Sequence, residues 1–321
     1  MSHAPALHAP PHPHVPVLKM GVPIPNGKLG MWLFLGTEIM FFTAFIGTYI
    51  VLRLGSKGWP TNPEITHIRI WAGGLNTFVL ITSSVFVVLA HEAMGLKNYK
   101  RATNWVIWTV VLAFVFLGIK SYEYYGKWKH DILPGHVAEN AQQARDKLVR
   151  ELDEASGLLA LQQEETKISN AIVIAESRNK PADSLKKELE AVQAKIQELN
   201  PAVAAYRPLK EKLKSGQIAL ADAAKELEDL QSDPTFGSRF GWVHEPHFIK
   251  WGNTFSSIYF TMTGFHALHV ILGIIMFAII VWLGLANKLG PQHALVVENF
   301  GLYWHFVDLV WIFLFPLIYI V

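Results

Sequence analysis

The sequence predicts an all-α fold: a multi-pass transmembrane helical bundle of five spans, with a soluble helical-hairpin or coiled-coil insertion between the third and fourth spans. Two features of the 321-residue chain support this prediction. Hydrophobic residues make up 51% of the chain and gather in long runs. Between the third and fourth runs lies a block rich in Glu, Lys, Gln and Ala and almost free of aromatic residues.

A transmembrane helix needs roughly 20 predominantly apolar residues. The segments that meet this length are 29–53, 68–94, 103–125, 252–286 and 295–321. The fourth is long enough to tilt or to extend beyond the lipid. We therefore expect four parts: a disordered Pro- and His-rich tail (1–28), spans one to three (29–126), the extramembrane insertion (127–247) and spans four and five (248–321).

The insertion carries the apolar spacing of paired helices. Steps of four and three residues, typical of coiled-coil positions a and d, relate Leu185, Leu189, Val192, Ile196 and Leu199. Helix breaks are expected at 179–181, where Pro181 can open a new helix, and also at 200–201 and 215–216. We expect an antiparallel hairpin with a short third helix. A solvated spacer is favoured over a specific docking module.

The composition excludes several kinds of site. Because the chain has no cysteine, it has no disulfide, thiolate metal site or cysteine-ligated copper. A net charge of +2 without a basic patch argues against nucleic acid as a partner. Residues 1–28 lack the apolar core of an export signal. The histidines of this tail are able to bind metal, but a weakly binding disordered tail is favoured.

Lysine and arginine in the short loops predict the orientation. Six lie on the N-terminal side, namely Lys19, Lys28, Lys97, Lys100, Arg101 and Lys288, and three on the other, namely Arg53, Lys57 and Arg69. Cytoplasmic loops are the richer in these residues. We therefore expect a cytoplasmic N-terminus in a bacterial inner membrane, with the insertion and the C-terminal end outside.

Glu38 is the first candidate functional residue. It lies about 12 Å along the first span from Gly30, at about 1.5 Å per residue, and Phe41 and Phe42 follow it. An acid at this depth must be paired, protonated or hydrated. The residues alone favour a structural Glu that joins helices over one that handles protons.

The second and third spans end in polar and aromatic residues. His91 lies near the end of the second span, and Glu123 lies among Tyr122, Tyr124 and Tyr125 at the end of the third. Tyrosines at a helix end are typical of an aromatic belt at the level of the lipid headgroups. We nevertheless count His91 and Glu123 among the residues expected to form an interhelical polar network or to contact lipid or other subunits.

The last two spans contain a denser set of polar residues. By helical spacing, His266 shares a face with His269, and Glu298, His305 and Asp308 form one stripe, flanked by Tyr303 and Trp304. Ionisable groups in a bilayer are expected to face the bundle interior. Several interpretations compete for the histidines: an interhelical hydrogen-bond network, which is favoured, haem ligation, ligation of a metal ion, or a proton relay.

Four motifs in order resemble subunit III of the haem-copper terminal oxidases, the cytochrome c oxidase subunit III family. They are Thr37-Glu38-Ile-Met-Phe-Phe, Tyr122-Glu123-Tyr124-Tyr125, Thr263-Gly-Phe-His266-Ala-Leu-His269-Val, and Tyr303-Trp304-His305-Phe-Val-Asp308-Leu-Val-Trp311. The resemblance covers roughly 26–126 and 248–321. It is closest to five-span bacterial members, since mitochondrial-type members have seven spans.

This resemblance implies a non-catalytic subunit of a proton-translocating oxidase, lying against subunit I in a complex with subunit II. It implies that haem and copper reside in the partner chains, that phospholipid occupies a cleft, and that Glu38 supports proton uptake. The insertion departs from the family pattern and leaves room for a further outer-face partner through 137–235. Open alternatives are a quinol oxidase or nitric-oxide reductase subunit, a self-contained b-type cytochrome, and a scaffold that recruits another complex.

Overall fold

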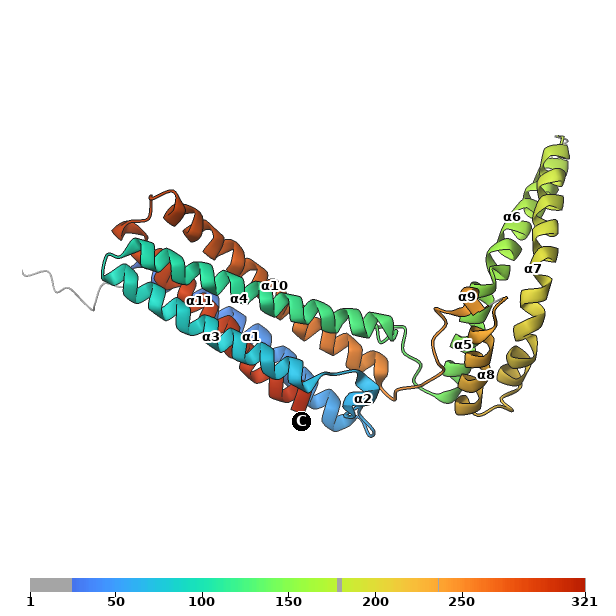
Figure 1. Ribbon diagram of the computed structural model, residues 1–321, viewed down its shortest axis with the longest axis horizontal. Coiled ribbons are helices and arrows are strands. Elements are labelled where there is room, and N and C mark those ends of the chain that lie inside the picture. Colours follow the sequence, from blue (N-terminus) through green and yellow to red (C-terminus); the bar gives the residue numbers. More distant parts are fainter. Residues whose placement is uncertain (1–24, 178–180, 236, 321) are drawn as a thin grey trace, which may run out of the picture.

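The computed structural model describes residues 25–177, 181–235 and 237–320, and these residues form a helical bundle with a helical insertion beyond one end (Figure 1). Five apolar helices are long enough to span a membrane. They are α1 (Asn26–Gly55), α3 (Ile70–Gly95), α4 (Tyr99–Lys129), α10 (Gly252–Leu285) and α11 (Ala294–Phe315), the last extended by η1 (Pro291–His293) and η2 (Pro316–Ile320). The predicted all-α fold is confirmed. Residues 1–24 of the predicted tail lie outside the described residues, and α1 already begins at Asn26.

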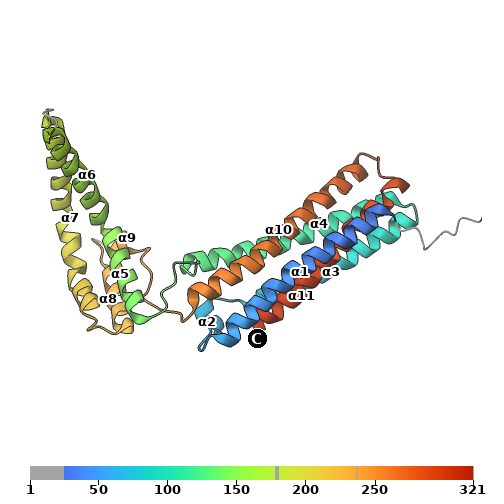
Figure 2. The same cartoon turned by 180° about the vertical axis from the view of Figure 1, so that it is seen from behind.

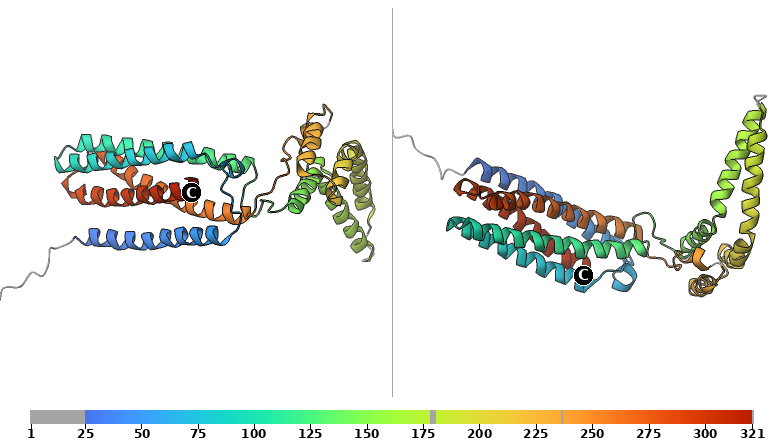
Figure 3. Two further views of the ribbon diagram at one scale, coloured as in Figure 1. Left: turned by 90° about the horizontal axis from the view of Figure 1, so that it is seen from below. Right: turned by 45° about the horizontal axis from the view of Figure 1, so that its top comes forward.

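The spans pack as two hairpins with α1 against one of them. α3 pairs with α4, α10 pairs with α11, and α11 also lies along α3. α1 contacts α10 and α11 and stands apart from the α3–α4 pair (Figure 3). Only Phe42 and Tyr49 are buried on α1. Its remaining apolar surface faces outward within this chain.

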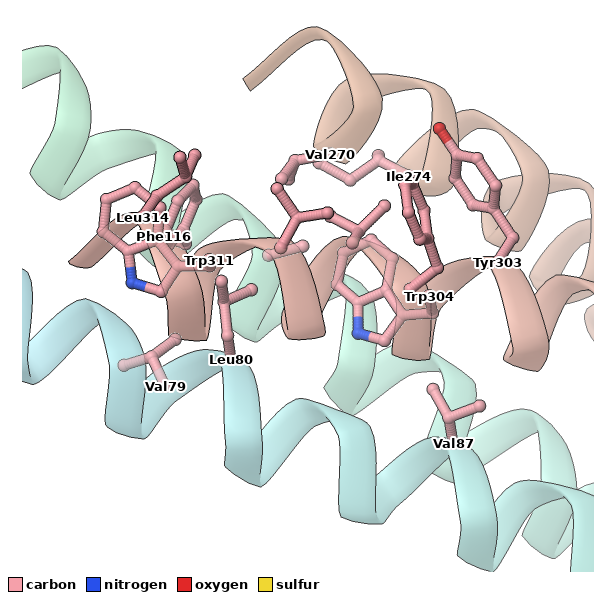
Figure 4. Packing of buried hydrophobic residues seen from close by; sticks show 14 of the residues in the cluster. Val79, Leu80, Val87, Phe116, Val270, Ile274, Tyr303, Trp304, Trp311 and Leu314 are labelled. Carbon is pink, nitrogen blue, oxygen red and sulfur yellow. The ribbon is translucent and has the colours of Figure 1, made fainter. Parts of the chain in front are cut away.

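Two tryptophans of α11 fill the centre of the bundle (Figure 4). Trp304 and Trp311 are both fully buried, and their indole N–H groups donate to Ser83 Oγ (2.9 Å) and Thr77 Oγ1 (3.0 Å). A Cβ added at Gly273 would lie 2.6 Å from the Trp304 ring. The small residue on α10 therefore allows this ring to lie directly on the helix backbone, the kind of close packing that small residues permit between membrane helices.

The insertion is a second, separate helical body (Figure 2). It contains α5 (Ala141–Ser156), α6 (Leu158–Ser177), α7 (Asp183–Ser215), α8 (Leu220–Ser232) and α9 (Gly237–Phe240). α6 and α7 form the predicted hairpin, whose seam contains the buried Ile168, Ile172 and Val192. At its base, α5, α7, α8 and α9 enclose a small core that includes Leu152, Tyr206 and Phe240.

One predicted helix break is wrong. α7 runs without interruption from Asp183 to Ser215, through Pro201 and Pro208. Proline removes one backbone donor and crowds the preceding turn. Both prolines are exposed, so water can satisfy the carbonyl groups they leave free, while Tyr206 and Leu209 hold the helix on α5. The break predicted at 215–216 is confirmed, because Gly216 ends α7 with φ of +69°. Residues 179 and 180 lie outside the described residues.

Two crossing segments tie the insertion to the bundle. Asn253, at the start of α10, bonds both backbone groups of Val137, and the Ile249 N–H donates to the Ala138 carbonyl at 2.8 Å. Ile132, Val137 and Ile249 form a small buried cluster beside these bonds. The connection is therefore packed and hydrogen-bonded and is not a free linker.

Candidate functional site

The carboxylate of Glu38 meets an imidazole from another helix. Glu38 Oε2 on α1 lies 3.1 Å from His269 Nε2 on α10. The two side chains are 19% and 9% exposed, respectively. Among the described residues, His269 is the only hydrogen-bond partner of the Glu38 side chain. The single acid in the middle of the apolar helix α1 is therefore paired with a base.

The second nitrogen of His269 determines which protons the pair can hold. His269 Nδ1 lies 2.7 Å from the carbonyl oxygen of Phe265, and a carbonyl oxygen only accepts hydrogen bonds. Nδ1 must therefore carry a hydrogen. Nε2 and Glu38 Oε2 then share a single proton, giving either neutral imidazole with carboxylic acid or imidazolium with carboxylate. Both arrangements have zero net charge, and neither places an isolated charge in the bilayer.

Aromatic rings surround this pair. The Tyr303 ring stacks with His269 at 6.3 Å between centroids, and its hydroxyl donates to the His269 carbonyl at 3.0 Å. Phe42 lies edge-on to the imidazole at 5.2 Å. The rings fix the imidazole orientation and exclude water from that side. The pair is therefore oriented, and its exposed edge is at Glu38.

His266 occupies a different environment although it lies only three residues from His269. It is 1% exposed and packs against the rings of Phe116 (5.6 Å) and Trp311 (5.2 Å). Neither ring nitrogen has a hydrogen-bond partner among the described residues. The two histidines predicted to share a face therefore have separate surroundings, and only His269 joins a polar contact.

The polar stripe predicted on the last span divides into two parts. His305 Nδ1 lies 2.6 Å from Ser84 Oγ on α3, and Asp308, which is 7% exposed, lies beside the same serine. Glu298 instead pairs with Lys28 at the start of α1, close to the end of the bundle. The stripe thus faces two neighbouring helices. His91 is exposed near the end of α3.

Glu123 belongs to a buried cluster, although its tyrosine neighbours in sequence suggested an aromatic belt. It is 3% exposed and accepts hydrogen bonds from Tyr259 (2.6 Å), Tyr319 (2.8 Å) and Lys120 (3.1 Å). Lys120 also donates to Tyr319 (2.7 Å) and Tyr259 (3.2 Å). All three ammonium hydrogens therefore have an acceptor. Tyr122 and Tyr125 remain exposed, as expected for a belt.

Two buried lysines of α4 were not predicted as site residues. Lys120 is 3% exposed, and Lys127 is 1% exposed, donates to the Thr66 carbonyl at 2.8 Å and lies 4.3 Å from the centre of the Tyr259 ring. The spacing of Lys120 and Glu123, three residues apart in an apolar segment, was the available signal. A lysine near the end of a span usually extends its side chain to the membrane interface, so its position in the sequence does not predict burial.

Asp131, Glu151 and His244 present possible metal-ligand atoms within 4.8 Å of one another. Lys147 places its ammonium 2.6 Å from Asp131 Oδ2 and 3.9 Å from Glu151 Oε1. The lysine already supplies positive charge to this group. The arrangement is therefore explained as an ionic link between the end of α4 and α5.

Comparison with known proteins agrees with the architecture. A model of the family "Cytochrome c oxidase subunit III" matches residues 19–129 and 242–321. Cytochrome c oxidase subunit 3 of Alkalihalophilus pseudofirmus is 39% identical over 100 residues, covering 31% of this chain and 48% of that protein. The same subunit of Bacillus sp. PS3 is 34% identical over 99 residues (31% and 47%), and that of Neurospora crassa 45% over 65 residues (20% and 24%).

The chain thus spans about half the length, or less, of these curated relatives. The gap between the two matched blocks coincides with the extramembrane helices α5 to α9. The blocks contain all five membrane-length helices, the Glu38–His269 pair and the Lys120–Glu123 cluster. The chain belongs to the cytochrome c oxidase subunit III family, as a five-span member with a helical insertion between its third and fourth membrane helices.

Proposed function

We propose that this chain is a non-catalytic subunit of a bacterial haem-copper respiratory oxidase, in which partner subunits I and II hold the haem and copper. In this role it stabilises subunit I, retains phospholipid and supports proton uptake through Glu38. Family membership supports the assignment to an oxidase. The observation that carries the proton-linked role is the contact of 3.1 Å between Glu38 Oε2 and His269 Nε2.

The exposure of Glu38 supports a proton-handling role over a purely structural one. A buried acid that only joins helices is best placed where every lone pair has a donor. Glu38 has a single described partner and keeps 19% of its side chain exposed, on the helix with the fewest buried residues. A proton shared with His269 can therefore be exchanged with a group of the neighbouring subunit that covers this edge.

The outer surface of α1 supports the contact with subunit I and lipid. Leu33, Met40, Val51 and Leu54 are between 66% and 82% exposed. Because this surface is apolar, it requires lipid tails or another membrane protein beside it. We assign both the subunit I contact and the retained lipid to this surface.

The same proposal includes the topology and the parts of the chain. Five basic residues belong to helix ends at the side of the bundle opposite the insertion (Figure 1): Lys28 in the first turn of α1, Lys97, Lys100 and Arg101 where α3 is followed by α4, and Lys288 after α10. This distribution favours a cytoplasmic N-terminus in the inner membrane. We also propose that the chain is divided into an N-terminal tail (1–28), spans one to three (29–126), the insertion (127–247) and spans four and five (248–321). The insertion, over 137–235, then offers a surface for an additional partner on the outer side.

Replacement of Glu38 by Gln tests the proton-linked role. The chain is purified in mild detergent with its partners, and a visible spectrum and mass spectrometry report whether haem- and copper-bearing subunits accompany it. We expect Glu38→Gln to retain these partners and its initial rate of O2 reduction but to inactivate after several-fold fewer turnovers, because the amide cannot exchange the shared proton.

Glu298→Gln is the matched control, since Glu298 is also paired across helices but with Lys28 instead of an imidazole. It should survive as many turnovers as the wild type. Equal lifetimes for wild type and Glu38→Gln would refute the proton-linked role. A chain that purifies alone with its own haem would refute the oxidase assignment itself.

A further inference from the structure

A large cavity lies where the membrane bundle meets the insertion. Its volume is about 1080 Å³, and it is lined by α2 (Pro63–Thr66) and His67, by the end of α4, and by the segment 241–248. We call it the junction cavity. Because the membrane-length helix α4 ends at Lys129, we expect the cavity to lie near the level where this span leaves the bilayer. A volume of this size lies at the upper limit of sites for small organic ligands.

Four histidines line the junction cavity: His67, His130, His244 and His247. The rings of His67 and His130 stack with centroids 3.8 Å apart and an interplanar angle of 10°. Burial, followed by the charges of His130 and Lys127, lowers the pKa of His67 to about 4, and burial with the charge of Lys129 also lowers the pKa of His130. Both rings are therefore neutral near pH 7, and each offers one donor and one acceptor nitrogen.

The hydrogen-bonding capacity of these two rings is unused. His244 Nε2 contacts the Lys129 carbonyl at 3.0 Å, and His247 Nδ1 contacts the Glu245 carbonyl at 3.0 Å. Among the described residues, no hydrogen bond joins a ring nitrogen of His67 or His130 to another group, although the His130 backbone N–H donates to the Gly126 carbonyl. The stacked pair therefore presents free polar nitrogens in a cavity that opens at the membrane surface.

The rest of the lining is aromatic and has little net charge. Trp128 and Trp242 are 62% and 49% exposed, and both line the cavity. The lining contains Lys129 together with Asp131 and Glu245, so there is no excess of positive charge to hold a phosphate. The lining suits an uncharged, planar molecule with oxygen atoms at its edge. Exposed Phe248 and Ile65 provide an apolar path for a hydrocarbon tail.

We propose that the junction cavity binds the headgroup of a membrane quinone, whose ring oxygens meet His67 and His130 and whose ring lies against Trp128 and Trp242. The isoprenoid tail then enters the bilayer past Phe248 and Ile65. The proposal concerns binding alone and assigns no electron transfer to the site. It does not depend on the proton-linked role of Glu38.

Photolabelling tests this proposal on the full chain purified with its partners in mild detergent. The probe is a short-tailed azido-benzoquinone, with the unlabelled short-tailed benzoquinone as competitor and peptide mass spectrometry as readout. We expect saturable labelling within 125–131 or 241–248. Trp128→Leu and His130→Gln, both at exposed positions that tolerate substitution, should each weaken binding about 10-fold or more.

Trp71→Leu and His91→Gln are the matched controls. Trp71 is 63% exposed at the same end of the bundle but does not line the cavity, and His91 is exposed near the opposite end of α3. Both variants should label like the wild type. Labelling that does not saturate, or that the cavity variants leave unchanged, would overturn the proposal. So would a phospholipid that co-purifies in the cavity and is not displaced by the benzoquinone.

Discussion

The Lys120–Glu123 cluster and the Glu38–His269 pair combine an acid with a base inside the same membrane bundle, but they differ in how completely their hydrogen bonds are satisfied. In the cluster, every ammonium hydrogen of Lys120 has an acceptor and Glu123 has three donors. In the pair, one proton is shared by two atoms, and Glu38 has no further described partner.

The difference is the basis for proposing a structural role for the cluster and a proton-exchanging role for the pair. The cluster joins α4, α10 and η2 at a site where Lys120 and Glu123 are each 3% exposed. Protons cannot leave it without exposing an unpaired charge to a low-dielectric interior. The pair lies between α1 and α10 with an accessible edge. A saturated network fixes helices, whereas proton exchange is our proposal for the pair, whose hydrogen bonds are not saturated.

The largest effect is expected when the cluster loses its cation. Lys120→Met keeps the length of the side chain but leaves Glu123 as a buried acid with only tyrosine donors. Removing one partner of a buried ion pair typically costs about 3–5 kcal/mol, since an uncompensated charge remains. We expect a large fall in the thermal unfolding midpoint of the detergent-purified complex, or failure of the chain to accumulate in the membrane.

The double variant Lys120→Met/Glu123→Gln provides the control, because it removes both charges together. Gln can still accept from Tyr259 and Tyr319, so a substantial part of the lost stability should return. If the single variant were as stable as the wild type, the cluster would not be the link between these helices. If the double variant were no better than the single, the loss would come from packing instead of charge.

A smaller effect on stability, but a distinct one on function, is expected from His269→Phe. The ring keeps its contacts with Phe42 and Tyr303, while Glu38 loses its hydrogen-bond partner. An unsatisfied polar group costs about 1–3 kcal/mol when buried, and the partial exposure of Glu38 should keep the loss near the lower value. Turnover lifetime should shorten as in Glu38→Gln.

The double variant Glu38→Gln/His269→Phe should then be no shorter-lived than either single variant, because both remove the same shared proton. His266→Phe is the matched control on the same helix. His266 makes no hydrogen bond to the described part of the chain, so its turnover lifetime should equal that of the wild type. Additive losses in the double variant would show that the two residues act separately.

These contrasts also show which features the sequence can reveal. Apolar length predicted the five spans, and the depth of Glu38 marked it as a residue that needs a partner. The identity of that partner depends on how α1 packs on α10, and helical spacing within one segment carries no information about it. Spacing alone grouped Glu298 with His305 and Asp308, but its ion pair is with Lys28 on another helix.

A related reason explains why the sequence did not predict the burial of the α4 lysines. Lys120 and Lys127 lie within the last turns of a span, where a long side chain ordinarily extends to the interface. Only the approach of Tyr259 and Tyr319 from other segments encloses them. The continuity of α7 through Pro201 likewise depends on packing against α5, which outweighs a local preference for a break.

The smallest effect concerns a titratable group in contact with water, outside the two membrane sites. Burial, His130, Lys127, His247 and Arg69 together lower the pKa of His67 from 6.5 to about 4. The unfolded chain therefore takes up a proton near pH 6.5, whereas the folded protein does so only near pH 4. The stability that His67 contributes is complete above pH 6.5 and is lost as the pH falls from 6.5 towards 4. Because the side chain is only partly buried, solvent screening keeps this contribution small.

The thermal midpoint of the purified complex at pH 7 and pH 5 tests this linkage. Wild-type protein loses stability over this interval partly because unfolding allows His67 to bind a proton, and His67→Gln lacks that group. The midpoint should therefore fall less between the two pH values in His67→Gln than in the wild type. His91→Gln, which changes an exposed histidine near the opposite end of α3, should leave the wild-type difference unchanged.

Identical pH responses in wild type and His67→Gln would mean that the stacked imidazoles are as accessible to protons in the folded protein as in the unfolded chain. Acid sensitivity would then have to arise elsewhere, and the contrast between satisfied and exchangeable groups would be confined to the membrane.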